Sequence, residues 1–303
     1  MPGWEGIWPV APTPFLDNGE VDHDGMRRVL DCMIDQGSTG ICILANFSEQ
    51  FLLSDAERES LTRLSLEHVA GRVPVIVTIS HYATPIAVAR ARLARDLGAA
   101  AVMMMPPYHG ALLKGTAEQT FEQFRAVGEV GIPIMVQDAP LSGVDLPVPL
   151  LVRMAREIEM VKLFKIECPQ AAAKLRVLIA EGGDAIEAPM DGEEAITLLA
   201  DLDAGATGSM TSASITDQIK PILTMWAAGD RDGATAGYAR VLPFVNHENR
   251  QCGFRSAKAL MVEGGVIGSE FCRHPIPPLH PDTRRMAIDL ARPLDPIVLR
   301  WGK

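Results

Sequence analysis

The sequence is poor in the features that mark membrane, secreted and nucleic-acid-binding proteins. None of its apolar stretches approaches the roughly 18–20 residues that span a bilayer. Its beginning has neither the basic leader nor the long apolar core of a signal peptide. The net charge is −10 and there is no cluster of basic residues. We therefore expect no membrane and no nucleic acid among its partners.

Cysteine and glycine motifs are also scarce. The five cysteines are widely spaced and none belongs to a CxxC pair, which predicts reduced thiols in a cytoplasmic protein. The same spacing argues against a structural zinc site, so we expect no metal. No GxGxxG or GxxxxGKS/T motif follows a predicted strand. This absence disfavours an open nucleotide-binding sheet.

What the sequence does contain is a regular alternation of short apolar runs with longer periodic segments that carry charged faces. Alternation with short connections predicts a parallel sheet covered by helices, and eight repeats favour closure into a (β/α)8 TIM barrel. The predicted strands are 7–11, 41–45, 73–79, 100–105, 132–136, 160–166, 185–188 and 206–210. The predicted helices are 22–35, 55–69, 85–97, 117–127, 149–158, 171–180 and 193–203, the second starting at the capping box of Ser54 and Glu57.

After residue 212 the strand signal stops and only helical segments follow. The predicted helices of this region are 215–228, 231–247, 256–263 and 282–291. There is no flexible Ser/Gly-rich linker before them, so we expect this region to pack on the barrel rather than move freely. The predicted domains are therefore a barrel, 1–213, and a C-terminal helical region, 214–303.

The predicted strand at 160–166 carries a lysine near its end. Side chains alternate between the two faces of a strand, so Lys165 and Glu167 share a face with the apolar Leu163. Burial disfavours the charged form of an amine, and a neutral amine is the nucleophile that forms a Schiff base with a ketone. A lysine at a strand end also commonly reaches water, so Lys165 alone leaves a structural role open.

Polar side chains follow most of the other predicted strands. In a barrel the carboxyl ends of the strands meet at one mouth, where catalytic residues lie. Each polar residue alone would also serve as a helix cap, a turn former or a satisfied strand end. Lys165 is the only lysine among them, and their convergence favours an imine-forming enzyme. The polar strand ends are 46–49, 80–82, 106–110, 137–138, 165–167, 191–194 and 208–212.

The sequence resembles the dihydrodipicolinate synthase / N-acetylneuraminate lyase family over almost its whole length. In that family a lysine on the sixth strand forms a Schiff base with a 2-keto acid, and Lys165 falls on that position. The family's Gly-Thr-Thr-Gly-Glu loop, which cradles the substrate carboxylate, is matched by 45–49, and its loop after strand eight by 208–212. The resemblance thus implies four substrate-binding residues, which are Asn46, Phe47 (through its backbone), Ser48 and Ser212.

One departure from the family pattern bears on the reaction. Family aldolases carry a proton-shuttling tyrosine in a Tyr-Asn-x-Pro motif, and here Gln137 takes its place. An amide has no titratable proton, so Gln137 cannot be a general acid–base, and aldol cleavage is disfavoured. An elimination needs removal of a C3 proton from the imine instead. Glu167 either takes that proton or pairs with Lys165 and positions it, and the sequence leaves both roles open.

Longer segments resemble a dehydratase branch of this family, which acts on a five-carbon L-2-keto-3-deoxy sugar acid. They are 42–51, 80–82, 106–110, 137–140, 191–196, 246–251 and 273–275. The resemblance implies a hydro-lyase of pentose catabolism that forms 2,5-dioxopentanoate and water. It implies catalysis by Lys165 and Glu167, with no metal or organic cofactor. The further substrate-binding residues that it implies are His81, Tyr108, His109, Gln137 and Asp191.

Two other classes of function stay open. A 2-keto-3-deoxy acid aldolase on the same barrel would release pyruvate, and Gln137 argues against it. A non-catalytic keto-acid sensor would bind without turnover, and it has no need of a buried amine at Lys165. The family resemblance also implies a homotetramer, in which a residue of the loop at Tyr108 and His109 reaches into a neighbouring subunit's site.

Overall fold

The computed structural model describes residues 3–109, 113–139 and 143–303. The chain divides into two compact units that interleave in sequence. Unit 1 comprises Met1–Glu5 and Val75–Met210, and unit 2 comprises Gly6–Pro74 and Thr211–Lys303. The boundary predicted after residue 213 stays a prediction.

Unit 1 is built on a parallel sheet. Over its described residues the strand order is β3-β4-β7-β8-β9-β10. The strands are β3 (Val75–Thr78), β4 (Ala101–Met104), β7 (Ile134–Asp138), β8 (Val161–Ile166), β9 (Ala188–Asp191) and β10 (Gly208–Ser209). The helices between them are α3 (Thr84–Asp96), α4 (Ala117–Gly128), α5 (Val148–Glu157), α6 (Ala171–Gly182) and α7 (Leu198–Asp203).

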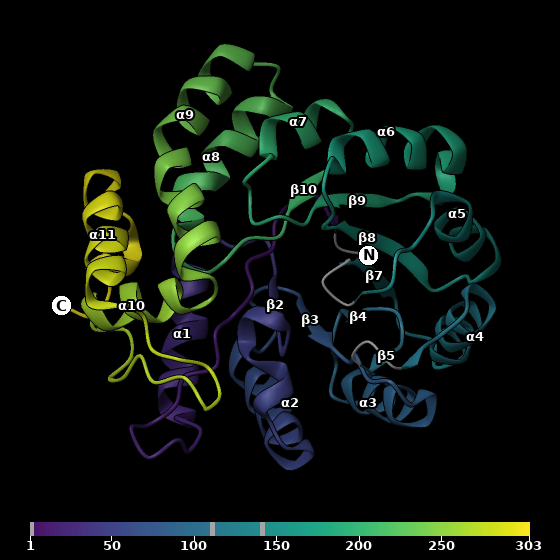
Figure 1. Ribbon diagram of the computed structural model, residues 1–303, viewed down its shortest axis with the longest axis horizontal. Helices are drawn as coiled ribbons and strands as arrows, with labels where there is room; N and C mark the ends of the chain where they lie inside the picture. Colours follow the sequence, from purple (N-terminus) through teal and green to yellow (C-terminus); the bar gives the residue numbers. More distant parts are fainter. Residues whose placement is uncertain (1–2, 110–112, 140–142) are drawn as a thin grey trace. The chain divides into compact units, whose positions relative to one another are not determined.

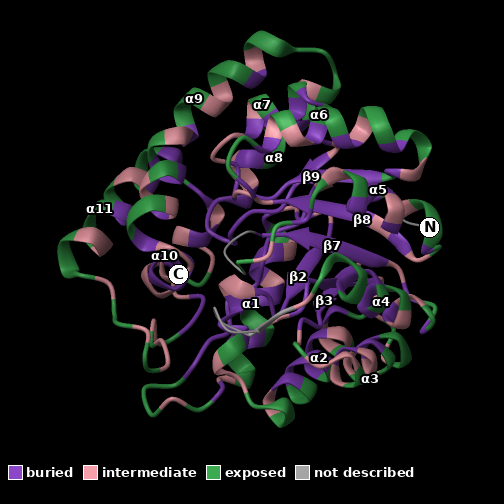
Figure 2. Cartoon of the chain, turned by 45° about the vertical axis from the view of Figure 1, so that its right-hand side comes forward, coloured by how far each residue is buried: buried purple, intermediate pink, exposed green. Residues whose placement is uncertain are grey.

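The strands of unit 1 are short apolar runs because both of their faces are covered. Helices α3 to α6 lie along the outer side of β4, β7, β8 and β9, and consecutive helices contact each other (Figure 1). The strands are almost wholly buried, whereas the helices turn exposed residues outward (Figure 2). Parallel strands that lose both faces to the interior carry apolar residues throughout, as the sequence predicts.

Two predictions for unit 1 were wrong in position. The strand predicted at 185–188 lies at Ala188–Asp191, because the short helix η4 (Gly183–Ala185) extends the turn after α6. The helix predicted from residue 193 begins only at Leu198, because Glu194 and Ala195 adopt left-handed backbone angles. No pattern in the sequence predicted the antiparallel pairing of β5 (Tyr108–His109) with β6 (Leu113–Lys114).

Unit 2 combines the first two strand–helix repeats with the C-terminal helices. The N-terminal elements are β1 (Gly6–Ile7), α1 (His23–Asp35), β2 (Ile41–Ile43), η1 (Asn46–Ser48), η2 (Gln50–Leu52) and α2 (Asp55–Val69). The C-terminal elements are α8 (Thr216–Ala227), α9 (Arg231–His247), the π-helix η5 (Glu248–Cys252), α10 (Arg255–Glu263), α11 (Pro281–Ala291), η6 (Arg292–Leu294) and η7 (Ile297–Leu299). The capping box predicted at the start of α2 is confirmed, with Ser54 and Glu57 bonded reciprocally.

Several contacts tie the C-terminal elements to the N-terminal ones within unit 2. Val10 forms parallel bridges with both Cys42 and Ser212. Helix α8 contacts β1, and η7 contacts α1. The Arg28 guanidinium on α1 donates to the carbonyl of Val266 over 2.8 Å. These contacts join segments about two hundred residues apart in sequence into one compact body. Over the described residues, no helix is long and apolar enough to cross a bilayer.

Candidate active site

An amine flanked by two carboxyl groups lies at the carboxyl ends of the strands of unit 1. Lys165 is only 3% exposed, and its Nζ lies 3.0 Å from Glu167 Oε2 and 3.6 Å from Glu194 Oε1. Gln137 donates from Nε2 to Glu167 Oε2 over 2.9 Å. Three of the predicted site residues, Lys165, Glu167 and Gln137, are thus brought together. Glu194 joins them without having been predicted as a site residue.

The pairing of three neighbouring strands places these groups. Gln137 on β7 stands in register with Lys165 on β8, which in turn stands in register with Met190 on β9. The backbone N–H of Glu167 donates to the carbonyl of Asp138 over 2.9 Å, which extends the ladder beyond the strand end. Because these hydrogen bonds fix the backbone on both sides, the Lys165 side chain projects from a rigid part of the sheet.

The loop after β9 brings Glu194 to the amine. Glu194 has φ +52°, in the left-handed region that favours glycine. Gly192 lies so close to β8 that an added Cβ would come within 2.7 Å of the carbonyl oxygen of Ile166 and 2.8 Å of Lys165 Cγ. Only glycine fits there, so the loop is pressed against the lysine. The sequence did contain a signal for this residue, a carboxylate two positions after a glycine at a strand end.

Asp138 forms a second buried ion pair beside Gln137. Its carboxylate has no exposed surface and lies 2.6 Å from the Nζ of Lys174 on α6. Burial raises the pKa of Asp138, and the contact with Lys174 partly offsets that rise. The pair joins the end of β7 to α6 and so holds the backbone from which Gln137 projects.

Three other predicted substrate contacts lie elsewhere in unit 1. The Nδ1 of His81 accepts the N–H of Ala83 over 2.9 Å, at the residue that caps α3. Tyr108 lies in β5, and burial raises the pKa of its phenol. The backbone of His109 belongs to β5, and its side chain lies outside the described part. The roles predicted for these three residues stay predictions.

In unit 2, the loop matched to the family's carboxylate-binding loop is tightly bonded. The Ser48 hydroxyl donates to the carbonyl of Ala11 over 2.6 Å and accepts the N–H of Ala45 over 3.1 Å. Asn46 Oδ1 accepts from Gln50 Nε2 over 2.7 Å, so the loop is rigid. The Ser48 hydroxyl proton is already used, and the backbone N–H of Ser48 donates to the carbonyl of Ala45 over 2.9 Å. A bound carboxylate would therefore have to rely on the backbone N–H groups at the start of this loop.

Ser212 belongs to a cluster of hydroxyl groups around a buried carboxyl group. The Oε1 of Glu248 accepts from the hydroxyls of Ser212 at 2.8 Å, Ser214 at 2.5 Å and Ser256 at 2.6 Å. Burial raises the pKa of Glu248, and the three hydroxyl donors counteract that rise. Glu248 opens the π-helix η5, a rare element that often marks functional positions. The substrate contact predicted for Ser212 stays a prediction.

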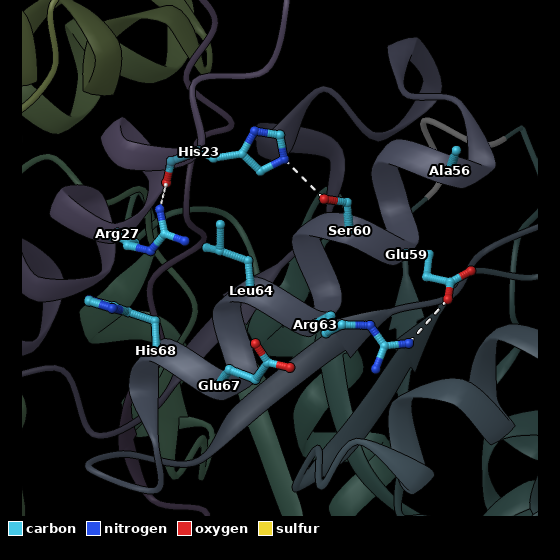
Figure 3. A pocket seen from close by; sticks show the side chains of 9 residues that line it. All are labelled: His23, Arg27, Ala56, Glu59, Ser60, Arg63, Leu64, Glu67 and His68. Atoms are coloured by element: carbon cyan, nitrogen blue, oxygen red, sulfur yellow. Dashed lines mark hydrogen bonds and ion pairs between the residues drawn. The ribbon is translucent and has the colours of Figure 1, made fainter.

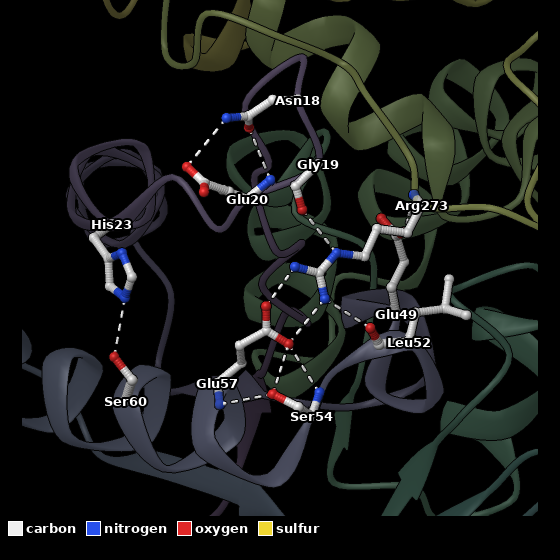
Figure 4. A network of polar contacts seen from close by, with 10 residues as sticks. All are labelled: Asn18, Gly19, Glu20, His23, Glu49, Leu52, Ser54, Glu57, Ser60 and Arg273. Atoms are coloured by element: carbon white, nitrogen blue, oxygen red, sulfur yellow. Dashed lines mark hydrogen bonds and ion pairs between the residues drawn. The ribbon is translucent and has the colours of Figure 1, made fainter.

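Glu49, the last residue of the 45–49 loop, is held by a charged network. The Lys258 ammonium on α10 donates to Glu49 Oε1, and both side chains have no exposed surface. Glu49 Oε2 accepts the backbone N–H of Arg273 over 3.2 Å. Figure 4 shows the Arg273 guanidinium reaching Glu57, Gly19 and Leu52 (Figure 4). The network connects the loop to the C-terminal region of unit 2.

An open pocket of about 720 Å³ lies between α1 and α2 in unit 2, and its charged side chains are largely paired with close neighbours (Figure 3). Arg27 pairs with Asp24, and Arg63 with Glu59. The His23 ring hydrogen bonds with Ser60 over 3.0 Å. Such exposed pairs stabilise helix faces weakly, and they do not form a catalytic arrangement. Nowhere in the described ranges do three or more His, Cys, Asp or Glu residues gather as metal ligands would.

The family follows from comparison with known proteins. The model of the dihydrodipicolinate synthetase family matches residues 4–292. The chain belongs to this family. It is 61% identical to L-2-keto-3-deoxyarabonate dehydratase of Azospirillum brasilense, over 99% of this chain and 98% of that protein. It is 30% identical to 4-hydroxy-tetrahydrodipicolinate synthase of Acidiphilium cryptum, over 90% and 92% of the two chains.

A solved structure confirms the predicted fold class. The crystal structure of dihydrodipicolinate synthase from Rhodopseudomonas palustris superposes with a TM-score of 0.87 at 26% identity, covering 96% of this chain and 98% of that one. This member of the dihydrodipicolinate synthetase family therefore has the (β/α)8 barrel fold with a C-terminal helical extension.

Proposed function

We propose that this protein is a Schiff-base hydro-lyase that dehydrates L-2-keto-3-deoxyarabonate to 2,5-dioxopentanoate, a step of pentose catabolism. The observation that carries the proposal is the buried Lys165 amine between Glu167 and Glu194, with an amide in place of the aldolase tyrosine. The 61% identity to a protein named for this activity supports the same substrate.

In the proposed reaction, Lys165 attacks the C2 ketone and expels water to form an imine. The imine acts as an electron sink, so a C3 proton becomes acidic. One carboxylate removes that proton and leaves an enamine. The enamine electrons then form the C3–C4 double bond as the C4 hydroxyl leaves as water. Hydrolysis of the imine consumes one water, which balances the water released when the imine formed. Tautomerisation places the aldehyde at C5, so the net reaction is the loss of one water.

The two glutamates take different parts in this scheme. Glu167 accepts the C3 proton, since it is held by both Lys165 and Gln137 next to the imine nitrogen. Glu194 delivers a proton to the departing C4 hydroxyl, since it approaches the amine from a different segment. Two carboxyl groups at one amine therefore serve as base and acid, which is what an elimination requires. Gln137 carries no titratable proton and orients Glu167.

The remaining predicted residues complete the proposal. The loop of Asn46, Phe47 and Ser48 binds the substrate carboxylate through its backbone N–H groups. The further substrate contacts of the proposal are His81, Tyr108, His109 and Ser212. No metal or organic cofactor takes part, because the imine supplies the electron sink. The proposal also includes a cytoplasmic homotetramer; the five cysteines, all free, support a reducing compartment.

The test combines adduct trapping with product analysis. Borohydride reduction in the presence of pyruvate should add one pyruvate-derived group at Lys165, located by mass spectrometry of peptides. Incubation with L-2-keto-3-deoxyarabonate should then yield the semialdehyde and no pyruvate. Release of pyruvate would make the protein an aldolase despite Gln137. An adduct without any product would make it a sensor, and absence of an adduct would remove the imine mechanism altogether.

A further inference from the structure

A buried acidic pair underlies the loop that carries Glu194. Asp191 ends β9, and its side chain has no exposed surface. Its Oδ1 accepts the N–H of Glu193 over 3.1 Å, and its Oδ2 accepts the N–H of Ala195 over 3.0 Å and the Ser209 hydroxyl over 2.5 Å. The two backbone N–H groups on either side of Glu194 therefore both donate to the Asp191 carboxylate.

Asp201 of α7 is the second carboxyl group of the pair. It is also fully buried, and its Oδ2 accepts the Thr197 hydroxyl over 2.6 Å. Its Oδ1 is buried without a hydrogen-bond donor among the described residues, and its side chain interacts with that of Asp191. Two adjacent buried carboxyl groups do not both stay ionised, so the pair shares a proton. A proton on Asp201 removes the unsatisfied acceptor and makes Asp201 a donor to Asp191.

The charges around the pair agree with this placement of the proton. Burial, followed by the negative charge of Asp191, raises the pKa of Asp201 to about 7. Glu193 adds a further negative charge nearby. Burial raises the pKa of Asp191 as well, but a hydroxyl and two backbone N–H groups counteract that rise by stabilising its ionised form. The proton therefore resides on Asp201, and Asp191 remains the acceptor that the loop requires.

We propose that Asp191, supported by the proton of Asp201, is the positioning residue that holds Glu194 at the Lys165 amine. The inference rests on the proposed function, in which Glu194 protonates the leaving hydroxyl. Glu194 and Ala195 have φ of +52° and +67°, angles that non-glycine residues keep only when neighbouring bonds fix them. Asp191 provides those bonds. It acts through Glu194 rather than on the substrate, because its oxygens are buried and bonded to the protein.

The matched test compares Asp191→Asn with Asp201→Asn in the full-length protein. In Asp191→Asn an amide NH₂ replaces one acceptor oxygen. One of the two backbone N–H groups of the loop then faces a second donor instead of an acceptor. We expect kcat to fall by about 10–100-fold, the cost of a small misplacement of a reacting group. KM and borohydride trapping of pyruvate at Lys165 should stay near wild type. Asp201→Asn keeps a neutral donor, and we expect its kcat to stay within about threefold of wild type.

A double-variant cycle shows whether Asp191 acts through Glu194. Asp191→Asn should cost little in a Glu194→Gln background, because the residue that it positions has already lost its proton. Fully additive losses would overturn the inference, as would a kcat of Asp191→Asn equal to wild type. A loss in Asp191→Asn that extends equally to pyruvate trapping would also overturn it, because that pattern means general unfolding of the site.

Failure of the positioning role and failure of the proposed function give different experimental results. If Asp191→Asn does not fold, Asp201→Ala is used in its place. Asp201→Ala removes the hydrogen-bond donor to Asp191 and should lower kcat, whereas Asp201→Asn keeps a donor and should not. Equal activity of these two variants would overturn the inference. If the wild-type protein forms no semialdehyde, the proposed function fails. Normal wild-type turnover with an unaffected Asp191→Asn removes only the positioning role.

Discussion

The two units each bury a lysine against a glutamate, and the surroundings of the two amines differ. Lys258 in unit 2 donates to Glu49 and to the carbonyl of Phe271, and lies 4.5 Å from the centre of the Phe15 ring. The other oxygen of Glu49 is taken by the backbone N–H of Arg273. Each of the two charged groups thus has one partner of opposite charge and is buried from solvent, as in a structural ion pair.

Lys165 in unit 1 differs in the number of carboxyl groups that face its amine. One amine there faces two carboxyl groups, Glu167 and Glu194, which come from separate segments, and Gln137 orients the first of them. Such a surplus of carboxyl groups costs stability in a buried site and suits a proton transfer between them. The comparison teaches that burial of a lysine is no sign of catalysis by itself. The number and origin of its partners distinguish the two cases.

Removing each amine should give the largest contrast. Lys165→Ala should abolish the borohydride adduct and lower kcat on the order of 10⁴-fold or more, because the electron sink is lost. Lys258→Met should still form the adduct at temperatures where it is folded. Mass spectrometry after trapping measures both variants. An adduct in Lys165→Ala, or one that depends on Lys258, would reverse the assignment of the two lysines.

Neutralising the carboxyl groups around Lys165 should have the next largest effect. Glu167→Gln and Glu194→Gln should each lower kcat by about 10²–10⁴-fold with a smaller change in KM, because acid–base catalysis is lost while binding remains. Pyruvate should still be trapped at Lys165 in both. Steady-state kinetics with L-2-keto-3-deoxyarabonate measures the loss. A variant with unchanged kcat would reduce that glutamate to a structural partner of the amine.

The pair in unit 2 should show itself in stability rather than in chemistry. Lys258→Met leaves the Glu49 carboxylate buried without its cation, and we expect the free energy of unfolding to fall by about 3–5 kcal/mol. The double variant Lys258→Met/Glu49→Gln should recover much of that loss, since no buried charge is left alone. Urea unfolding followed by circular dichroism gives both values. Equal stability of Lys258→Met and wild type would show that the pair is not structural.

The half-buried pair of Glu57 and Arg273 should have the smallest effect, about 1 kcal/mol or less at neutral pH. The hydrogen bond from Arg273 lowers the pKa of Glu57 to about 2 from an ordinary 4.5. A lowered folded pKa gives stability that is present above pH 4.5 and is lost as the pH falls towards 2. The stability difference between Glu57→Gln and wild type should therefore close over this range. Melting curves from pH 7 to 2 measure it, and a constant difference would contradict the pairing.

The fold and the first residues of the candidate site were accessible from the sequence because they follow from local patterns. Strand–helix alternation predicted the barrel, and strand periodicity placed Lys165 and Glu167 on one face. Glu194 was missed as a site residue because its segment was predicted as the start of a helix. The left-handed angles of Glu194 and Ala195 depend on bonds to Asp191 that no local pattern announces. The Lys258–Glu49 pair spans 209 residues and was equally invisible.

Gly192 gives the buried Lys165 amine a sequence marker that is independent of the lysine itself. A methyl group at this position would overlap the Ile166 carbonyl and the Lys165 side chain at 2.7 and 2.8 Å. A search for proteins with the same chemistry should therefore require the glycine as strictly as the lysine. An otherwise similar chain with a larger residue there must either move the loop away from its lysine or do without the second carboxylate.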